Sequence, residues 1–233
     1  MIFDILIPAF NESANLPRIE EQLIPQLQRD RVEFEVLVVD DGSTDDTGSK
    51  ADELARRRKD VRVIHHERNM GLGAALRTGY SHASHQWVVS IDCDLSYSPD
   101  QVRRLVERVS PEVDAVFGSP YMRGGQVLGV GQMRVIPSKG VNVLYSLIMR
   151  RNLSCWTGMF RAVRTSAVQS IRITQDGFDG VAEIAVKLAR KGFQIVEVPA
   201  VLGRRTAGES KAHLGREFRR HLVQLEKLIA REM

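Results

Sequence analysis

Two aspartates, Asp92 and Asp94, stand one residue apart at the end of an apolar, β-branched stretch, residues 87–91. Such a stretch is typical of a buried strand, and in an open α/β sheet ligands collect at the carboxyl ends of the strands. Carboxylate oxygens suit Mg²⁺ and Mn²⁺, and Mg²⁺ commonly takes one or two carboxylates together with substrate phosphates. The pair therefore predicts a divalent-cation site. The structural alternative is that the two acids only end a strand and begin a turn.

The elements that would position these acids alternate along the first half of the chain. Stretches typical of strands are separated by segments with helical spacing, which predicts an α/β fold with a mostly parallel sheet flanked by helices. Polar or acidic residues follow the first, second and fourth strands, so their side chains should meet at one edge of the sheet. The strands expected in this half are residues 2–7, 34–39, 61–65, 87–91 and 113–117. Residues 11–13 are expected to cap a helix that runs to about Arg29.

The second half is less regular. After a glycine-rich segment, the expected elements are a helix at 138–150, a strand at 159–163, a helix at 181–190 and a strand at 193–198. Residues 213–231 have the pattern of an amphipathic helix, with an apolar stripe on one side and most basic residues off it. That stripe is expected either to pack in the core or to lie on an anionic membrane surface.

Composition limits the class of protein. The 233 residues are 43% hydrophobic and 27% charged, which is ordinary for one soluble domain with a sizeable core. A formal net charge of +4 does not suit a strongly cationic nucleic-acid binder. No stretch reaches the roughly 18 apolar residues of a transmembrane helix, and no signal peptide is visible. The two cysteines, Cys93 and Cys155, lack metal-type spacing, so we expect a cytoplasmic protein.

Several motifs together resemble one family. Residues 8–12 (Pro-Ala-Phe-Asn-Glu), 38–45 (Val-Val-Asp-Asp-Gly-Ser-Thr-Asp), Asn69-x-Gly71 and 92–94 (Asp-Cys-Asp) resemble the nucleotide-sugar half of family 2 glycosyltransferases, which have the GT-A fold. In the second half, Arg134-x-x-x-Ser138, Glu197-Val198-Pro199 and the run from Arg205 to Lys211 resemble polyprenyl- and dolichyl-phosphate sugar transferases, of which the mannosyl enzymes are the best known. The resemblance implies a GT-A domain at 1–211, with a nucleotide-sugar half (1–118) and an acceptor half (119–211), followed by an amphipathic helix at 212–233.

The resemblance also implies roles for individual residues. Asp94, Ser96 and Asp92 are the expected ligands of Mg²⁺ or Mn²⁺, and Asp92, Asp94, Arg205 and Lys211 are the expected catalytic residues. The nucleotide-sugar site is expected to comprise Pro8, Phe10, Glu12, Val38, Asp40, Asp41, Asp92, Cys93, Asp94, Arg205 and Lys211. For Pro8, shaping a turn is the alternative, and for Asp41 the alternative is that it makes no contact with the nucleotide-sugar. The expected acceptor side comprises Arg123, Arg134, Ser138 and Glu183, where Glu183 has the alternative of anchoring the basic loop at 203–211. Asn142 either faces the acceptor or packs.

The reaction implied is inverting, in-line transfer of a sugar from a nucleotide-sugar to a polyprenyl or dolichyl phosphate, on the cytoplasmic face of a membrane. A phosphate acceptor is already anionic near neutral pH and needs no general base, whereas a hydroxyl acceptor would need one, for which Asp176, Asp179 and Glu183 are candidates. The donor stays open between GDP-mannose and a UDP-hexose, and the oligomeric state stays open too.

Three other interpretations compete with this one. The acceptor could be a hydroxyl of a saccharide or a small metabolite, or the chain could be a non-catalytic nucleotide-sugar-binding subunit. A dinucleotide oxidoreductase is disfavoured, because Gly71-Leu72-Gly73 lacks the third glycine of the fingerprint and follows the third strand. One departure from the family pattern stands out: the family usually has an arginine where this chain has Pro120, and Arg123 is the candidate to replace it.

Overall fold

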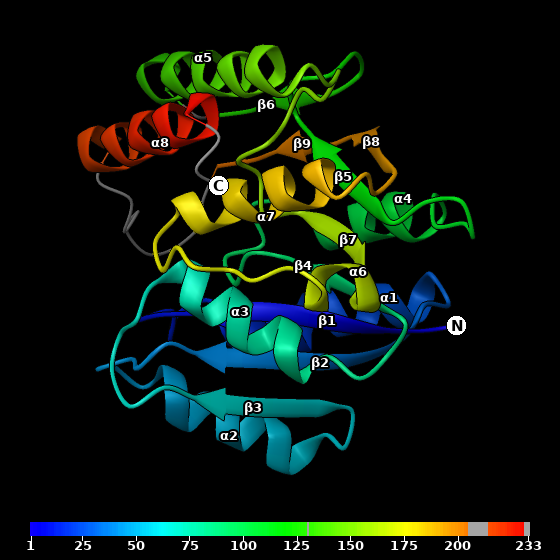
Figure 1. Cartoon of the computed structure of the whole chain (residues 1–233). Coiled ribbons are helices and arrows are strands. Elements are labelled where there is room, and N and C mark those ends of the chain that lie inside the picture. The colour runs from blue at the N-terminus through cyan, green and yellow to red at the C-terminus, as the bar shows by residue number, and fades with distance from the viewer. Residues whose placement is uncertain (130, 205–213, 231–233) are drawn as a thin grey trace.

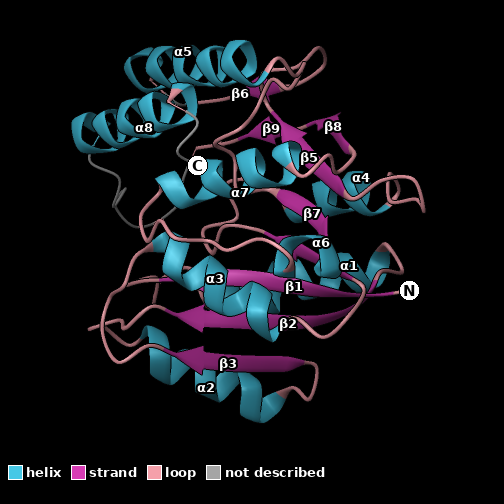
Figure 2. Ribbon diagram, in the orientation of Figure 1, coloured by secondary structure: helices cyan, strands magenta, loops and turns pink. Residues whose placement is uncertain are grey.

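A seven-stranded sheet forms the centre of the computed structural model, which describes residues 1–129, 131–204 and 214–230 (Figures 1 and 2). The strands of this sheet are β1 (Ile2–Ala9), β2 (Glu33–Asp40), β3 (Val61–His65), β4 (Trp87–Ser90), β5 (Ala115–Ser119), β7 (Arg161–Arg164) and β8 (Ile195–Pro199). Their order is β3-β2-β1-β4-β7-β5-β8. All neighbouring strands run parallel except β7, which is antiparallel to both β4 and β5. The expected mostly parallel α/β sheet is therefore confirmed. A separate pair joins β6 (Gln126–Val127) to β9 (Val201–Leu202).

Helices cover both faces of the sheet, because alternate side chains of each strand point to opposite faces. In β1, Ile5 and Ile7 belong to a core cluster with α1, α2 and α4, while Leu6 belongs to a second cluster with α3, α6 and α7. The helices are α1 (Ile24–Arg29), α2 (Thr47–Arg57), α3 (Leu72–His82), α4 (Val102–Val106), α5 (Gln132–Met149), α6 (Thr165–Gln169), α7 (Asp179–Arg190) and α8 (Leu214–Ile229). Within the described residues, no helix combines the length and the apolar character needed to cross a bilayer.

An outer layer of two helices lies over α7. Figure 1 shows α5 and α8 side by side, and the two helices contact each other and the core cluster on that face. Leu225 and Leu228 of α8 are buried in that cluster. Part of the stripe predicted for residues 213–231 therefore packs in the core. The division of the chain at residue 211 stays a prediction.

Most boundaries differ from those expected by one or two residues, and two helix starts differ by more. Asn11 does not start a helix: its φ is +51°, and its Oδ1 accepts a hydrogen bond from the Thr44 backbone N–H at 2.8 Å. A π-helical turn, Ile19–Leu23, leads into α1 instead. Helix α5 begins at Gln132, before the expected residue 138, and contains Pro137. Proline is disfavoured inside a helix because it removes one backbone hydrogen bond, and for that reason Pro137 suggested a helix start after it rather than before it.

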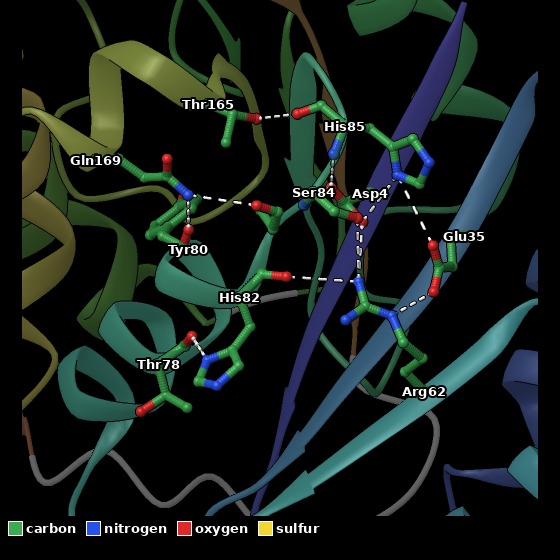
Figure 3. A network of polar contacts seen from close by, with 11 residues as sticks. Asp4, Glu35, Arg62, Thr78, Tyr80, His82, Ser84, His85, Thr165 and Gln169 are labelled. Atoms are coloured by element: carbon green, nitrogen blue, oxygen red, sulfur yellow. Dashed lines mark hydrogen bonds and ion pairs between the residues drawn. The ribbon is translucent and has the colours of Figure 1, made fainter.

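A buried polar network joins the amino ends of β1, β2 and β3 (Figure 3). Asp4 is fully buried, and its Oδ2 accepts the backbone N–H groups of Ser84 and His85 at 2.8 Å each. Its Oδ1 lies 3.1 Å from His85 Nδ1 and 3.5 Å from Arg62 Nη2, while Arg62 also pairs with Glu35. Asp4, Glu35 and His85 are close enough together to ligate a metal. Because Arg62 already compensates both carboxylates, we interpret the network as structural.

Asp4→Ala is expected to lower the free energy of unfolding by about 3 kcal/mol, because two buried N–H groups lose their acceptor and Arg62 loses a partner. Urea denaturation measures the change. The matched control is Glu33→Ala, which removes only an exposed ion pair with the amino terminus and should barely move the midpoint. Equal midpoints for the two variants would show that the network contributes nothing.

Candidate active site

The turn after β4 holds the predicted cation ligands. Leu95 adopts a left-handed φ of +52°, and its N–H donates to the Asp92 carbonyl at 3.0 Å. Asp94 is buried, and its Oδ1 accepts hydrogen bonds from the N–H (2.9 Å) and Oγ–H (2.7 Å) of Ser96. Arg18 Nη1 donates to the Asp94 carbonyl at 2.6 Å, which ties the turn to the chain before α1. Two carboxylates and a hydroxyl form an all-oxygen donor set, which fits Mg²⁺ or Mn²⁺.

Asp40 ends β2, next to the end of β1, where Ala9 is its partner in register. Its Oδ1 accepts the Ser43 N–H at 3.1 Å, and its Oδ2 lies 2.9 Å from His65 Nδ1. The carboxylate is therefore held at the sheet edge where the β4 turn also lies. Val38, in contrast, is fully buried in the core, so the structure does not bring its side chain to this edge.

His65 links Asp40 to Asp52 of α2, with 2.9 Å to each carboxylate. Burial lowers the pKa of His65, but the hydrogen bonds with Asp40 and Asp52 outweigh it, so the pKa lies above its ordinary value. A raised pKa in the folded state means that the charged imidazole stabilises the fold.

We expect His65→Gln to destabilise the protein more in acid than in alkali. The stabilisation by His65 is complete below the unfolded-state pKa of about 6.5 and is lost as the pH rises through the higher folded-state pKa. Urea unfolding of both proteins between about pH 5.5 and about pH 9 measures the difference. A difference that stays constant across this range would contradict the prediction.

Asp41 points into the protein rather than along the sheet edge. Its Oδ1 accepts the Met70 N–H at 2.9 Å and lies 2.6 Å from His66 Nδ1. Its Oδ2 accepts the Gly71 N–H at 2.8 Å and the Asn69 side-chain N–H at 2.9 Å. These contacts give Asp41 a supporting role within the protein, and nucleotide contact by Asp41 stays a prediction.

The segment after β1 packs against the turn after β2. Glu12 is buried, its N–H donates to Thr47 Oγ1 at 2.8 Å, and its Oε2 accepts from Asn15 Nδ2 at 2.5 Å. Phe10 and Pro8 are half-buried at the same end of β1. The residues expected to form one wall of the nucleotide site therefore lie together, whereas Cys93 is buried in the core.

A cavity of about 340 Å³ connects the β4 turn with α5. Its lining is mostly apolar, and its polar residues include Asp92, Ser96, Tyr121, Ser138, Thr157 and His221. Asp92 and Ser96 come from the end of the cavity at the predicted cation site, and Ser138 comes from the expected acceptor side. The structure thus brings residues of both predicted halves to one space. Cys155 also lines it, and burial raises the pKa of its thiol to about 11, so the thiol stays protonated.

The loop before β7 forms one wall of the cavity, and buried polar side chains hold it. Asn142 Oδ1 accepts the N–H groups of Trp156 (2.5 Å) and Thr157 (3.1 Å), which supports the packing alternative for Asn142. Arg161 is buried and donates to the carbonyls of Gly158 and Val181. Burial lowers the pKa of Arg161. These contacts position the wall of the cavity.

Other residues expected on the acceptor side lie elsewhere. Glu183 is fully buried and accepts hydrogen bonds from Thr174, Gln175 and Lys187. Burial raises the pKa of Glu183, but the bonds from Lys187 and Thr174 outweigh it and leave the pKa below its ordinary value. Arg123 is exposed and does not line the cavity. Arg205 and Lys211 lie outside the described residues, and so does the side chain of Arg134.

Sequence reasoning missed His221, which reaches the cavity from α8. It precedes the buried residues Leu225 and Leu228 by four and seven positions, so helical spacing puts it on their side of the helix. That spacing was the available signal. Tyr121 was missed as well, and nothing in its surrounding sequence singled it out.

Known proteins resemble this chain in sequence. The model of glycosyl transferase family 2 matches residues 4–172. A dolichol-phosphate mannosyltransferase from Pyrococcus furiosus is 32% identical over 232 residues, which cover 97% of this chain but only 64% of that relative. A polyprenol monophosphomannose synthase from Mycolicibacterium smegmatis is 32% identical over 214 residues, which cover 89% of this chain and 79% of that relative. This chain therefore spans less than two thirds of the Pyrococcus relative.

Solved structures resemble this chain in fold. Glucosyl-3-phosphoglycerate synthase from Mycobacterium tuberculosis, in complex with Mn²⁺, UDP and phosphoglyceric acid, superposes with a TM-score of 0.74 at 22% identity, over 98% of this chain and 78% of that one. A mannosyltransferase from Pyrobaculum calidifontis, in complex with GDP-Man and Mn²⁺, superposes with a TM-score of 0.69 at 23% identity, over 98% and 64%. At these identities the likeness establishes the fold, which is the expected GT-A fold. With this fold, the match over residues 4–172 and relatives of 32% identity, the chain belongs to glycosyl transferase family 2.

Proposed function

We propose that the protein is a metal-dependent, inverting glycosyltransferase that moves a sugar from a nucleotide-sugar to a polyprenyl phosphate. The observation that carries the proposal is the shared cavity, in which Asp92 and Ser96 of the β4 turn meet Ser138 of α5. The names of the Pyrococcus and Mycolicibacterium relatives support a polyprenyl phosphate acceptor. The Mn²⁺ complexes with UDP and with GDP-Man support a nucleotide-sugar donor and leave its base open.

In this proposal, three groups of residues bind the cation, the nucleoside and the phosphates. Asp94, Asp92 and Ser96 would hold Mg²⁺ or Mn²⁺, which when bound supplies Lewis-acid stabilisation of the departing nucleoside diphosphate. Asp40, with Pro8, Phe10 and Glu12, would receive the nucleoside. Arg205 and Lys211 would bind the phosphates of donor and acceptor, since both side chains suit phosphate.

The positions of the candidate bases favour a phosphate acceptor over a hydroxyl acceptor. Asp176 is exposed and pairs with Arg77 at 2.8 Å, and Glu183 accepts the hydrogen bonds described above. Neither of these residues lines the cavity, and Asp179 does not line it either. A hydroxyl acceptor needs a base within hydrogen-bond reach, whereas a phosphate oxygen is already anionic.

The outer layer of helices suits a lipid-linked acceptor. On α5, Ile136, Val143, Leu144 and Leu147 are exposed, while Pro137, Ser138 and Val141 of the same helix line the cavity. Leu222 and Val223 of α8 are also exposed. We therefore propose that α5 and α8 rest on an anionic membrane surface, from which the phosphate of a lipid can reach the cavity.

We expect Val143→Asp combined with Leu147→Asp to abolish most binding to vesicles that contain anionic lipid, because a charge on each exposed apolar site opposes insertion. Co-sedimentation measures the bound fraction. The matched control is Ile2→Asp, which changes a comparably exposed apolar residue at the far end of β1. Equal binding by the double variant and the control would contradict a membrane-facing α5.

The proposed function is tested by product formation. The wild type is incubated with GDP- or UDP-sugars, with Mn²⁺, Mg²⁺ or chelator, and with polyprenyl phosphate or sugar hydroxyls as acceptor. Metal-dependent formation of a polyprenyl-phosphate sugar supports the proposal. Transfer only to a hydroxyl, or nucleotide-sugar binding without turnover on any acceptor, would overturn it.

A further inference from the structure

His221 is a buried histidine in the cavity that the mechanism so far does not use. Its side chain is only 8% exposed, and it lines the same space as Asp92 and Ser138. Among the described residues that line this space, it is the one that can carry a positive charge near neutral pH. Pro120, which stands where the family usually has an arginine, lines the cavity too.

The neighbours of His221 favour a proton on its Nδ1. The Tyr145 hydroxyl donates to Gln224 Oε1 at 2.6 Å, so its oxygen accepts from His221 Nδ1–H at 3.2 Å. In the neutral ring, Nε2 is then the hydrogen-bond acceptor. The edge of the imidazole ring packs against Tyr145, with 6.0 Å between the ring centroids, which orients the ring.

The surroundings of His221 favour a neutral ring. Burial lowers the pKa of His221, and Asp179 of α7 and the hydrogen bond with Gln224 oppose this only in part. On α5, burial raises the pKa of Tyr145, so its hydroxyl stays neutral. Burial also raises the pKa values of Tyr121 and Cys155, which line the same cavity, so both stay neutral. Asp92 lines the cavity at the proposed cation site.

We propose that His221 binds the phosphate of the acceptor through Nε2, and this inference rests on the proposed function. A lipid monophosphate that still carries one P–O–H proton passes that proton to Nε2. The imidazolium then donates its new N–H to the dianionic phosphate, and an unprotonated phosphate oxygen attacks the sugar. The C–O bond to the departing nucleoside diphosphate breaks, the product is a monoanionic diester, and the proton leaves His221 for solvent.

This arrangement predicts a specific pH dependence. The productive complex contains one proton shared between His221 and the phosphate, whose second pKa is about 6. Above that pH the free acceptor loses the proton, so the contribution of His221 to kcat/KM for the acceptor declines. A neutral amide at the same position would donate to the phosphate without taking up a proton, and its effect would not follow this decline.

The test compares wild type with His221→Gln in metal-loaded protein, with polyprenyl phosphate as acceptor. We expect the KM for the acceptor to rise about tenfold near pH 6.5, the value of one hydrogen bond to a charged group, with the KM for the donor unchanged. The ratio of wild-type to variant kcat/KM should shrink toward unity above about pH 8. His82→Gln, an exposed histidine at the end of α3, is the matched control and should behave like wild type.

A second variant keeps the test decisive if His221→Gln proves unstable. Tyr145→Phe removes the acceptor of Nδ1–H but keeps the ring packing, and it should raise the acceptor KM by a smaller factor with the same pH signature. An equal rise in the KM values for donor and acceptor would overturn the role of His221. So would pH profiles of wild type and variants that differ only by a constant factor. Failure of the wild type to use polyprenyl phosphate would instead overturn the proposed function.

Discussion

Asp94→Asn is expected to lower the kcat of sugar transfer by about 10³-fold, because the buried carboxylate would be the firmest ligand of the catalytic cation. The asparagine is almost isosteric, so the Ser96 contacts that shape the turn are disturbed little and the loss is mainly of metal affinity and charge. Ser96→Ala removes the hydroxyl that donates to Asp94 and should cost about tenfold. Initial rates across a Mn²⁺ titration measure both effects.

The design separates chemistry from folding. Asp100→Asn, an exposed acid just beyond the same turn, is the matched control and should keep wild-type rates. Thermal midpoints identify any variant that fails to fold. If Asp94→Asn retains metal-dependent turnover within a few-fold of wild type, the Asp92–Asp94 turn does not hold the catalytic cation, and the proposed mechanism is wrong.

Local patterns were enough to predict the parallel half of the sheet. Strands β1 to β4 are apolar stretches followed by helices, and this alternation restricts them to a parallel arrangement. The antiparallel strand β7 was expected only as a strand, since its pairing with β4 and β5 depends on residues far away in the sequence. Strand β9 has only two residues, Val201–Leu202, and leaves no periodic signal.

The candidate site was predictable where position along a strand decides it. Asp92 and Asp94 follow the end of β4, and Asp40 is the last residue of β2, so topology alone brings them to one edge of the sheet. Sequence shows that a residue is polar, but not which distant backbone groups use it. Glu183 was therefore expected at the acceptor, whereas its bonds to Thr174 and Gln175 come from a loop that only the fold brings near.

Asp41→Asn is expected to lower the free energy of unfolding by about 3–5 kcal/mol, because it removes a buried charge that accepts several hydrogen bonds. An amide keeps one oxygen acceptor but places its NH₂ group against the donors of the other oxygen, either the Met70 N–H or the Gly71 N–H. The loop that these residues form supports a second loop, since Gly73 N–H donates to the Asp176 carbonyl at 2.8 Å. Gly71 has a φ of +99°, and a Cβ there would lie 2.3 Å from that carbonyl oxygen, so the two loops are packed closely together at this point.

The same variant distinguishes the two roles considered for Asp41. If the carboxylate supports the fold, the midpoint of urea unfolding falls, and the protein that remains folded binds nucleotide-sugar about as well as wild type. If it is a ligand, donor affinity falls while the unfolding midpoint stays. Asp46→Asn is the matched control, because Asp46 is an exposed acid of the same run whose side chain makes no capping hydrogen bond to α2. Since both oxygens of Asp41 are engaged within the protein, we expect the first outcome.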